Sequence, residues 1–235
     1  MIYGIRKRMT AALLAGALMS ALGACGSSQE NVRREETAAA ADSVSAADRE
    51  ESVAGEDNIL IAYFTAGENS GVDAVSSASY ITVDGEAVGR LRAVADMIQD
   101  KTGGELFSIR TSVVYPTDGG ELIDYAAQEQ DENARPELTS HIDNFEQYDI
   151  VFVGYPNWWA DLPMAVYSFF DEYDFSGKTI IPFNVHNGSR FSRTIETIQE
   201  LEPDALVVEE GFTVSERDVA EAQEDVTAWL EGLGY

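Results

Sequence analysis

One run of four apolar residues, 150–153, constrains the fold of this chain more than any other feature of its sequence. In a surface strand apolar and polar residues alternate, whereas a continuous apolar run is typical of a strand that is covered on both faces. Gly154 and Pro156 follow the run and are expected to end the strand. Because strands buried on both faces belong to parallel sheets flanked by helices, the run predicts an α/β fold.

Apolar runs and amphipathic patterns alternate through residues 58–235, a stretch of about 180 residues that suffices for one domain with a full core. Besides the central run, strands are predicted over residues 58–64, 105–109, 178–183 and 205–209. Helices are predicted over residues 121–134, 163–173, 191–201 and 216–232. Five strands that alternate with helices predict a doubly wound, five-stranded parallel sheet.

One more helix is predicted between the first two strands. Its apolar face is formed by Val88, Leu91, Val94, Ala95 and Ile98. Asp84 is available as its N-terminal cap, and Gly103 and Gly104 are expected to end it. In the strand over residues 178–183, Pro182 cannot donate a ladder hydrogen bond, so it is expected in the last turn of that strand.

Three loops are expected to meet at the carboxyl edge of this sheet, over residues 65–71, 155–159 and 184–191. Hydroxyls, backbone amides and indole rings in these loops suit an aromatic ligand that carries a phosphate, and FMN fits that description. The middle loop is expected to expose Tyr155, Asn157, Trp158 and Trp159. The alternative is that both indoles cover the core; because adjacent side chains point apart, we expect one ligand contact and one packing residue.

The amino-terminal segment is predicted to be a signal that is removed. Arg6, Lys7 and Arg8 precede an apolar stretch that is shorter than the roughly 18 residues of a membrane-spanning helix. Residues 22–25, Leu-Gly-Ala-Cys, resemble the lipobox of bacterial lipoproteins, in which the cysteine is lipidated and the protein is held outside the cytoplasmic membrane. Residues 1–24 are therefore predicted to be a lipoprotein signal peptide; the alternative is an ordinary signal followed by an accidental cysteine.

Residues 25–57 are predicted to be a disordered tether that starts at the lipidated Cys25. After the cysteine, this segment is dominated by Ala, Ser and charged residues and has no aromatic residue, so it lacks the apolar surface that folding requires. The formal net charge is −27, and −30 without Arg6, Lys7 and Arg8 of the signal. This charge repels nucleic acid and anionic lipid, so membrane attachment would come from the lipid, while a basic partner protein remains open.

The composition also argues against several enzyme classes. Cys25 is the only cysteine and is assigned to the lipid, and the two histidines are His141 and His186. No zinc or copper site is therefore expected, and no disulfide can form within one chain. The sequence contains no Gly-x-Ser-x-Gly motif, so serine-hydrolase chemistry has no support.

Three motifs in residues 59–235 resemble the flavodoxin-like superfamily, in its longer branch: Tyr63 with Phe64, residues 154–159 (Gly-Tyr-Pro-Asn-Trp-Trp), and residues 177–186. The resemblance implies an FMN-binding fold with strand order 2-1-3-4-5. It places the FMN phosphate near Thr65, Ala66, Gly67, Asn69 and Ser70. It places the flavin between Pro156, Asn157, Trp158 and Trp159 on one side and His186, Asn187, Gly188 and Ser189 on the other.

The chain departs from this family at the phosphate loop. Flavodoxins pass almost directly from the first strand into a helix, often through Gly-Asn-Thr, whereas here residues 72–85 intervene and the matching place reads Gly89-Arg90-Leu91. Glu68 would also repel a phosphate unless its side chain turned away. The missing donors could be replaced by Ser70, Ser76, Ser77, Ser79 and the cation of Arg90. The alternative is that these are surface serines and a solvated helix arginine.

The sequence therefore predicts an FMN-dependent redox protein tethered outside the membrane, either an electron carrier or a small quinone- or nicotinamide-linked reductase. The alternative is a non-redox binding module that keeps the fold but has an altered phosphate loop. His186 is open to two interpretations, an ordinary hydrogen-bonding loop residue or a group that transfers protons near its usual pKa of about 6.5.

Overall fold

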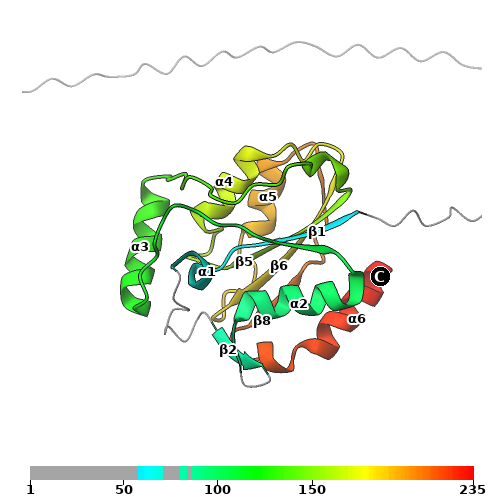
Figure 1. Cartoon of the computed structure of the whole chain (residues 1–235), viewed down its shortest axis with the longest axis horizontal. Coiled ribbons are helices and arrows are strands. Elements are labelled where there is room, and N and C mark those ends of the chain that lie inside the picture. Colours follow the sequence, from blue (N-terminus) through cyan, green and yellow to red (C-terminus); the bar gives the residue numbers. More distant parts are fainter. Residues whose placement is uncertain (1–57, 71–79, 84–85) are drawn as a thin grey trace, which may run out of the picture. The chain divides into compact units, whose positions relative to one another are not determined.

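A computed structural model of the chain describes residues 58–70, 80–83 and 86–235 (Figure 1). The predicted signal peptide, Cys25 and the tether lie outside the described residues, as do Gly71, Ser76, Ser77, Ser79 and Asp84. None of the described helices is long and apolar enough to cross a membrane.

The main sheet is built from parallel strands in the order β4-β1-β5-β6-β7, and β8 also pairs with β6. Counted in chain order as the five predicted strands, this is 2-1-3-4-5, so the predicted fold class and strand order are confirmed. The strands are β1 (Ile59–Tyr63), β4 (Glu105–Ser108), β5 (Ile150–Pro156), β6 (Thr179–His186), β7 (Leu206–Val207) and β8 (Phe212–Ser215).

Helices cover both faces of this sheet, and each face has its own apolar core (Figure 1). On one face lie α2 (Arg90–Thr102) and α6 (Gln223–Leu233), whose buried residues include Val94, Ile98 and Val226. On the other face lie α3 (Gly119–Asp131), α4 (Met164–Glu172) and α5 (Thr194–Leu201). Burial on both faces is the reason that the central strand is continuously apolar.

Of the two residues predicted to end the central strand, Gly154 lies inside β5, and the strand ends at Pro156. Gly154 pairs in register with Tyr63 of β1 and Phe183 of β6. A Cβ atom at this position would lie 2.1 Å from the Phe183 ring, so the glycine makes room for an aromatic side chain inside the sheet. The glycine is therefore a packing residue within the strand.

Pro182 lies in the middle of β6 and not at its last turn, which corrects the sequence prediction. At this point β6 changes its neighbour: Thr179 and Ile180 pair with β7, whereas the residues from Phe183 onward pair with β8. The carbonyl of Ile180 faces β7, so Pro182, two residues further on, faces the gap between β7 and β8. A residue in that gap needs no N–H donor, so proline is tolerated there.

The carboxyl-terminal region contains a strand that the sequence analysis missed. The predicted strand over 205–209 shrinks to the two residues of β7, and β8 (Phe212–Ser215) extends the same edge of the sheet. A short 3-10 turn over Val219–Glu221 follows, so the last helix begins at Gln223 and not at residue 216.

The helix predicted from Val88 begins instead at Arg90. Val88 belongs to β3 (Glu86–Gly89), which pairs antiparallel with β2 (Tyr80–Val83) in a separate two-stranded sheet. Gly89 stands at the N-cap position and supplies no side-chain cap, whereas Gly103 ends the helix as predicted, at a φ of 72°. The hairpin thus places Arg90 at the first position of α2.

Candidate functional site

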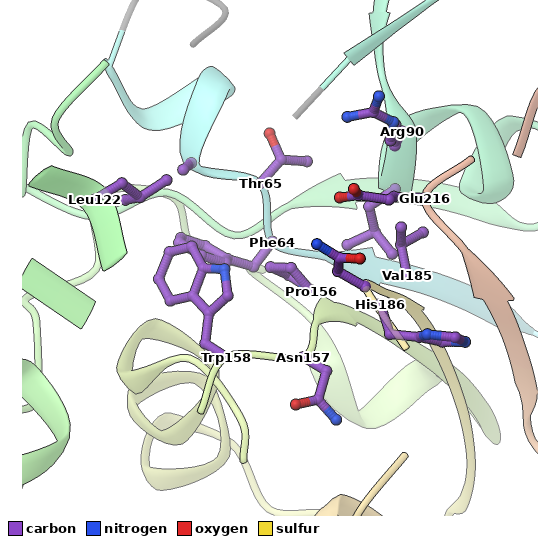
Figure 2. Close-up of a pocket in the computed structure, with 13 residues that line it drawn as sticks. Phe64, Thr65, Arg90, Leu122, Pro156, Asn157, Trp158, Val185, His186 and Glu216 are labelled. Atoms are coloured by element: carbon purple, nitrogen blue, oxygen red, sulfur yellow. The ribbon is translucent and has the colours of Figure 1, made fainter. Parts of the chain in front are cut away.

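A cleft opens at the carboxyl ends of β1, β5 and β6, the edge at which the sequence predicted that three loops would meet (Figure 2). The cavity volume is about 90 Å³. Its lining comes from the ends of these strands and the segments that follow, from α2 and α3, and from the residue after β8. The lining residues are Phe64, Thr65, Ala66, Arg90, Leu91, Leu122, Pro156, Asn157, Trp158, Val185, His186, Asn187 and Glu216.

The structure divides the predicted site residues into two groups. Seven of them line the cleft: Thr65, Ala66, Pro156, Asn157, Trp158, His186 and Asn187. The other six do not: Gly67, Asn69, Ser70, Trp159, Gly188 and Ser189. The lining also includes Phe64, Leu91, Leu122, Val185 and Glu216, which sequence reasoning did not select, and Arg90, which it weighed as a cation for the phosphate.

Trp158 forms an aromatic wall of the cleft. Its ring meets Phe64 edge-to-face at a centroid distance of 5.5 Å and Tyr115 at 5.8 Å. Backbone hydrogen bonds between Trp158 and Asp161 close the turn in both directions, and the Gln130 side chain donates to the Trp158 carbonyl at 2.8 Å. The indole is therefore held by the core on one side while it lines the cleft on the other.

The neighbouring Trp159 has a different environment. It is 59% exposed, its φ is 52°, and its indole N–H donates to the carbonyl of Ile123 at 3.0 Å. The two indoles therefore point apart. Tyr155, which the sequence predicted to be exposed, is fully buried, and its hydroxyl donates to Thr194 Oγ1 at 2.8 Å. The reason is that β5 extends past Gly154 and carries Tyr155 inside the sheet.

The loop after β1 forms a short helix, α1 (Ala66–Ser70), and its polar groups hold the loop itself. Thr65 Oγ1 accepts a hydrogen bond from the Glu68 backbone N–H at 3.2 Å, as an N-cap does. The Asn69 amide donates to the carbonyls of Thr65 and Ile109, and its oxygen accepts from the Thr111 backbone N–H at 2.7 Å. Asn69 therefore joins α1 to the segment after β4 and takes no part in the cleft lining.

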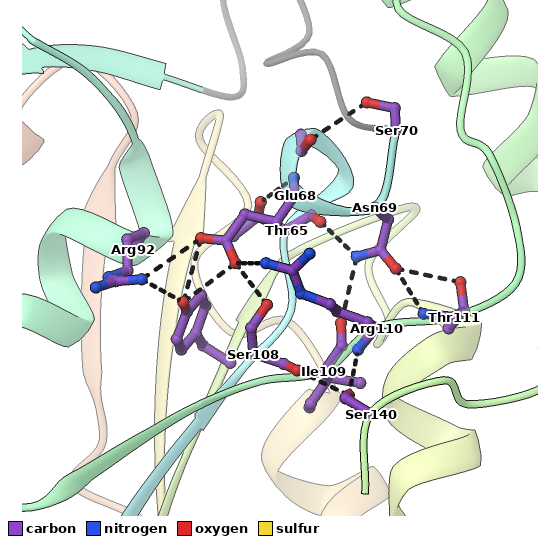
Figure 3. A network of polar contacts seen from close by, with 12 residues as sticks. Thr65, Glu68, Asn69, Ser70, Arg92, Ser108, Ile109, Arg110, Thr111 and Ser140 are labelled. Atoms are coloured by element: carbon purple, nitrogen blue, oxygen red, sulfur yellow. Dashed lines mark hydrogen bonds and ion pairs between the residues drawn. The ribbon is translucent and has the colours of Figure 1, made fainter.

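The Glu68 carboxylate belongs to a polar network on the side of β1 toward β4, shown in Figure 3. The hydroxyl of Tyr63 donates to it at 3.2 Å and that of Ser108 at 2.5 Å. Arg110 and Arg92 lie 3.6 Å and 3.9 Å from its oxygens. Burial, together with the nearby Glu68 charge, raises the pKa of Tyr63 to about 12, so this hydroxyl stays a donor at physiological pH. Glu68 does not line the cleft.

The strand β6 ends at the cleft with His186. The ring Nδ1 accepts a hydrogen bond from the Gly188 backbone N–H at 2.8 Å, which places the proton of the neutral ring on Nε2. Partial burial, with the charge of Arg190 as a second cause, lowers the pKa of His186. The ring is therefore neutral at pH 7, and it offers Nε2–H as a donor.

A buried amide fixes the following loop. The Asn184 side chain is fully buried, donates to the Arg190 carbonyl at 2.9 Å and accepts from the Thr213 hydroxyl at 2.6 Å. The Asn157 amide donates to the same Arg190 carbonyl at 2.6 Å. This carbonyl thus links the loops after β5 and β6, and β8 contributes to the link through Thr213.

Two residues that line the cleft carry buried polar atoms without hydrogen-bond partners in the described part of the chain. They are Arg90, through Nε and one terminal nitrogen, and Asn157, through Oδ1. Because a buried polar group is costly when unpaired, such atoms indicate where a ligand can bind. The guanidinium of Arg90 is chemically suited to the phosphate of FMN, and the amide oxygen of Asn157 to an N–H group at the edge of the ring system. The indole of Trp158 is suited to contact the ring system itself.

The size of the enclosed space limits this fit. Its volume of about 90 Å³ is smaller than the roughly 300 to 1,000 Å³ of typical small-molecule pockets. A ligand as large as FMN would therefore have only part of its ring system in the enclosed space, with the remainder on the open side of the cleft.

The fold and the cleft together define a flavodoxin-type α/β protein with a candidate ligand site at the carboxyl edge of its sheet. Residues 78–233 match the family model described as Flavodoxin, so the chain belongs to the flavodoxin family. The match begins after β1 and α1 and within residues 72–85, the segment that intervenes where flavodoxins pass almost directly from the first strand into a helix. Among proteins with curated functions, none matches the chain.

Several solved structures share the fold. A protein from Bacteroides eggerthii DSM 20697 described as a flavoprotein is 26% identical, with a TM-score of 0.52 over 73% of this chain and 98% of that one. One from Bacteroides uniformis ATCC 8492 is 23% identical, with a TM-score of 0.57 over 74% and 98% of the two chains. A flavoprotein from Lactobacillus acidophilus NCFM, in complex with FMN, is 17% identical, with a TM-score of 0.50 over 70% and 97%.

Behind Trp158 lies the buried carboxyl group of Glu129, one of whose oxygens has no hydrogen-bond partner among the described residues. The Tyr115 ring packs on Trp158, its hydroxyl lies 3.5 Å from Glu129 Oε1, and Glu129 Oε2 has no partner among the described residues. Glu129 is 6% exposed, and burial raises its pKa from 4.5 to about 7. The group is therefore mostly protonated just below neutral pH and ionised above it.

We expect the two tryptophans to differ in their effect on stability. Trp158→Ala leaves a cavity beside Phe64 and Tyr115, so it should lower the free energy of unfolding by about 3 to 5 kcal/mol and also weaken FMN binding. Trp159→Ala removes an exposed ring and should change stability by less than about 1 kcal/mol. Chemical denaturation and FMN titration of both variants check this. Equal losses of stability in the two variants would contradict the assignment of Trp158 to the wall.

Glu129 should make stability depend on pH. Since its pKa is higher in the folded state than in the unfolded chain, its favourable contribution is complete below about pH 4.5 and is lost as pH rises through 7. Glu129→Gln should therefore raise the free energy of unfolding at pH 8 by roughly 1 to 2 kcal/mol and have little effect at pH 4. Denaturation across this range, with the exposed Asp124→Asn on the same helix as a control, measures it; equal gains at both pH values would refute the pKa shift.

Proposed function

We propose that this protein binds FMN in the cleft at the carboxyl ends of β1, β5 and β6 and acts as a redox protein. One observation carries the proposal. In a chain of the flavodoxin family, the cleft at the switch point of the sheet is lined by the Trp158 indole and by two residues, Arg90 and Asn157, whose buried polar atoms lack partners among the described residues. The Lactobacillus acidophilus flavoprotein, which shares the fold, was solved in complex with FMN and adds support.

The residues of the cleft have distinct roles in this proposal. Trp158 supplies a flat apolar surface for the ring system, with Phe64 and Pro156 nearby in the lining. Asn157 Oδ1 accepts a hydrogen bond from a ring N–H, because this atom is buried and lacks a partner. His186, with its proton on Nε2, donates to a ring acceptor. These groups bind and orient the flavin.

Bound FMN supplies the electron-transfer chemistry, and the protein sets the environment in which that chemistry occurs. The formal net charge of −27 disfavours an anionic reduced flavin and so lowers the reduction potential. An electron carrier and a small quinone- or nicotinamide-linked reductase both agree with these features. The acidic surface favours a basic partner protein or a small substrate over nucleic acid.

A second function, a non-redox binding module, is favoured by two observations. The enclosed volume of about 90 Å³ is small for a flavin, and the family match begins at residue 78, after the segment that would carry the phosphate loop. In this case Trp158 would contact a smaller flat molecule. The two functions differ in whether the cleft holds a flavin, which is directly measurable.

We also propose that Cys25 is lipidated and anchors the protein on the outside of a bacterial membrane. The support is the sequence of residues 22–25, which resembles a lipobox and follows a basic and then apolar segment. Residues 26–57 then act as a tether between the lipid and the folded domain.

The cofactor proposal predicts that the purified full chain binds FMN stoichiometrically. After incubation with FMN and gel filtration, the protein fraction should keep the flavin absorption bands, and free flavin fluorescence should fall on titration. Reduction and reoxidation of the bound flavin should be reversible. Protein that emerges colourless and leaves the fluorescence unchanged would support the non-redox module instead.

The anchor proposal predicts that Cys25→Ser shifts the protein from the membrane fraction to a soluble or unprocessed form, because the tether offers no other apolar anchor. Fractionation at high salt with an antibody against the folded domain measures the change. Ser27→Ala, two residues after the cysteine, is the control and should stay in the membrane fraction. A Cys25→Ser protein that has lost residues 1–24 and still sediments with membranes at high salt would rule out the lipid anchor.

A further inference from the structure

Arg90 differs from other arginines of the described chain in having buried nitrogens without partners. Its side chain lines the cleft, and Nε and one terminal nitrogen are fully buried and form no hydrogen bond. Arg92, by contrast, donates to Asp96 at 2.6 Å and to Tyr63, and Arg135 donates to Asp171 at 2.6 Å. A guanidinium keeps its charge at any physiological pH, so the unpaired nitrogens carry a free-energy cost.

The carboxylates around the cleft do not remove this cost. Glu216 lines the same cleft but forms no ion pair with Arg90. Glu68 is committed to Tyr63 and Ser108 on another side of β1. An anion that enters the cleft could therefore accept hydrogen bonds from the unpaired N–H groups of Arg90.

The position of Arg90 favours an anion further. It is the first residue of α2, a helix of 13 residues, and the first turn of that helix carries no acidic residue. In Figure 2, Arg90 and Thr65 stand on the side of the cleft opposite to Trp158 and Asn157. Thr65, the expected phosphate ligand, accepts from the Glu68 N–H through Oγ1, which leaves its O–H able to donate to an anion held by Arg90.

We propose that Arg90 is the phosphate anchor of this cleft and takes the place of the Gly-Asn-Thr donors of flavodoxins, where this chain reads Gly89-Arg90-Leu91. The inference rests on the proposed FMN function and assigns phosphate recognition to one planar cation at the start of α2. The guanidinium donates N–H groups to phosphate oxygens, while the ring system lies toward Trp158. It follows that the protein distinguishes FMN from riboflavin chiefly through Arg90.

The experiment compares the dissociation constants of FMN and riboflavin for the full chain and three variants. Arg90→Ala should raise the Kd of FMN by about 10- to 100-fold, because it removes charge-assisted hydrogen bonds to the phosphate. It should change the Kd of riboflavin, which has no phosphate, by less than about threefold. Arg90→Lys keeps the charge but loses the planar guanidinium group. Its Kd for FMN should therefore lie between that of the unchanged protein and that of Arg90→Ala. Arg217→Ala removes an exposed charge outside the cleft lining and should alter neither.

Thermal melting without ligand separates anchoring from a structural role. Because no described group pairs with the buried nitrogens, Arg90→Ala should melt at or above the temperature of the unchanged protein. A large fall in melting temperature, for both Arg90 variants, would overturn the proposal in favour of a structural arginine.

The remaining outcomes distinguish this inference from the proposed function. If the unchanged protein binds neither flavin, both are wrong. If it binds FMN and riboflavin equally well, flavin binding stands and the phosphate anchor is refuted. If Arg90→Ala keeps the full preference for FMN, the phosphate is held elsewhere. Loss of that preference, with riboflavin binding and stability retained, supports Arg90 as the anchor.

Discussion

Burial of β5 between β1 and β6 is the constraint on which the rest of the structure depends. Every residue from Val151 to Tyr155 is buried, and Gly154 gives its side-chain space to the Phe183 ring of the next strand. A strand in this position must be covered by helices on both faces, so the chain alternates between strand and helix. The carboxyl ends of β1, β5 and β6 then lie next to one another, and the cleft forms where the segments that follow them meet.

Hydrogen bonds between those segments decide which polar groups remain for a ligand. Asn69 and Asn184 hold the loops after β1 and β6, and Glu68 is held by Tyr63 and Ser108. These groups are satisfied within the protein and are therefore poor candidates for ligand contacts. Arg90 and Asn157 keep buried atoms without partners, which is why they, and not the hydroxyls of α1, define the polar part of the cleft.

The sequence predicted the elements that depend on local pattern. The apolar run at 150–153 identified the central strand, and the five-strand alternation led to the correct class of fold. The position of Pro182 was predicted wrongly because its tolerance depends on where β7 ends and β8 begins, a tertiary feature. The strand β8 was missed, although Phe212 and Val214 alternate with Thr213 and Ser215 as a half-buried strand does. Glu216, the residue after it, was consequently not selected.

Long-range contacts limited the prediction of the site in the same way. Asn69 looks like a loop donor in the sequence, but its partner Thr111 is 42 residues away. Arg90 was predicted to lie in a helix. The burial of its nitrogens results from packing around the cleft, which the periodicity of the sequence does not reveal. Trp158 and Trp159 were expected to diverge, and they do because φ is positive at Trp159 after the strand ends.

A crystal structure of the full chain grown with saturating FMN would show whether and how the cleft holds the flavin. We expect flavin density at the carboxyl edge of the sheet, with the ring system against Trp158 and the phosphate at the guanidinium of Arg90. Density for FMN at another surface, or a cleft that stays closed by protein side chains at saturating FMN, would contradict it.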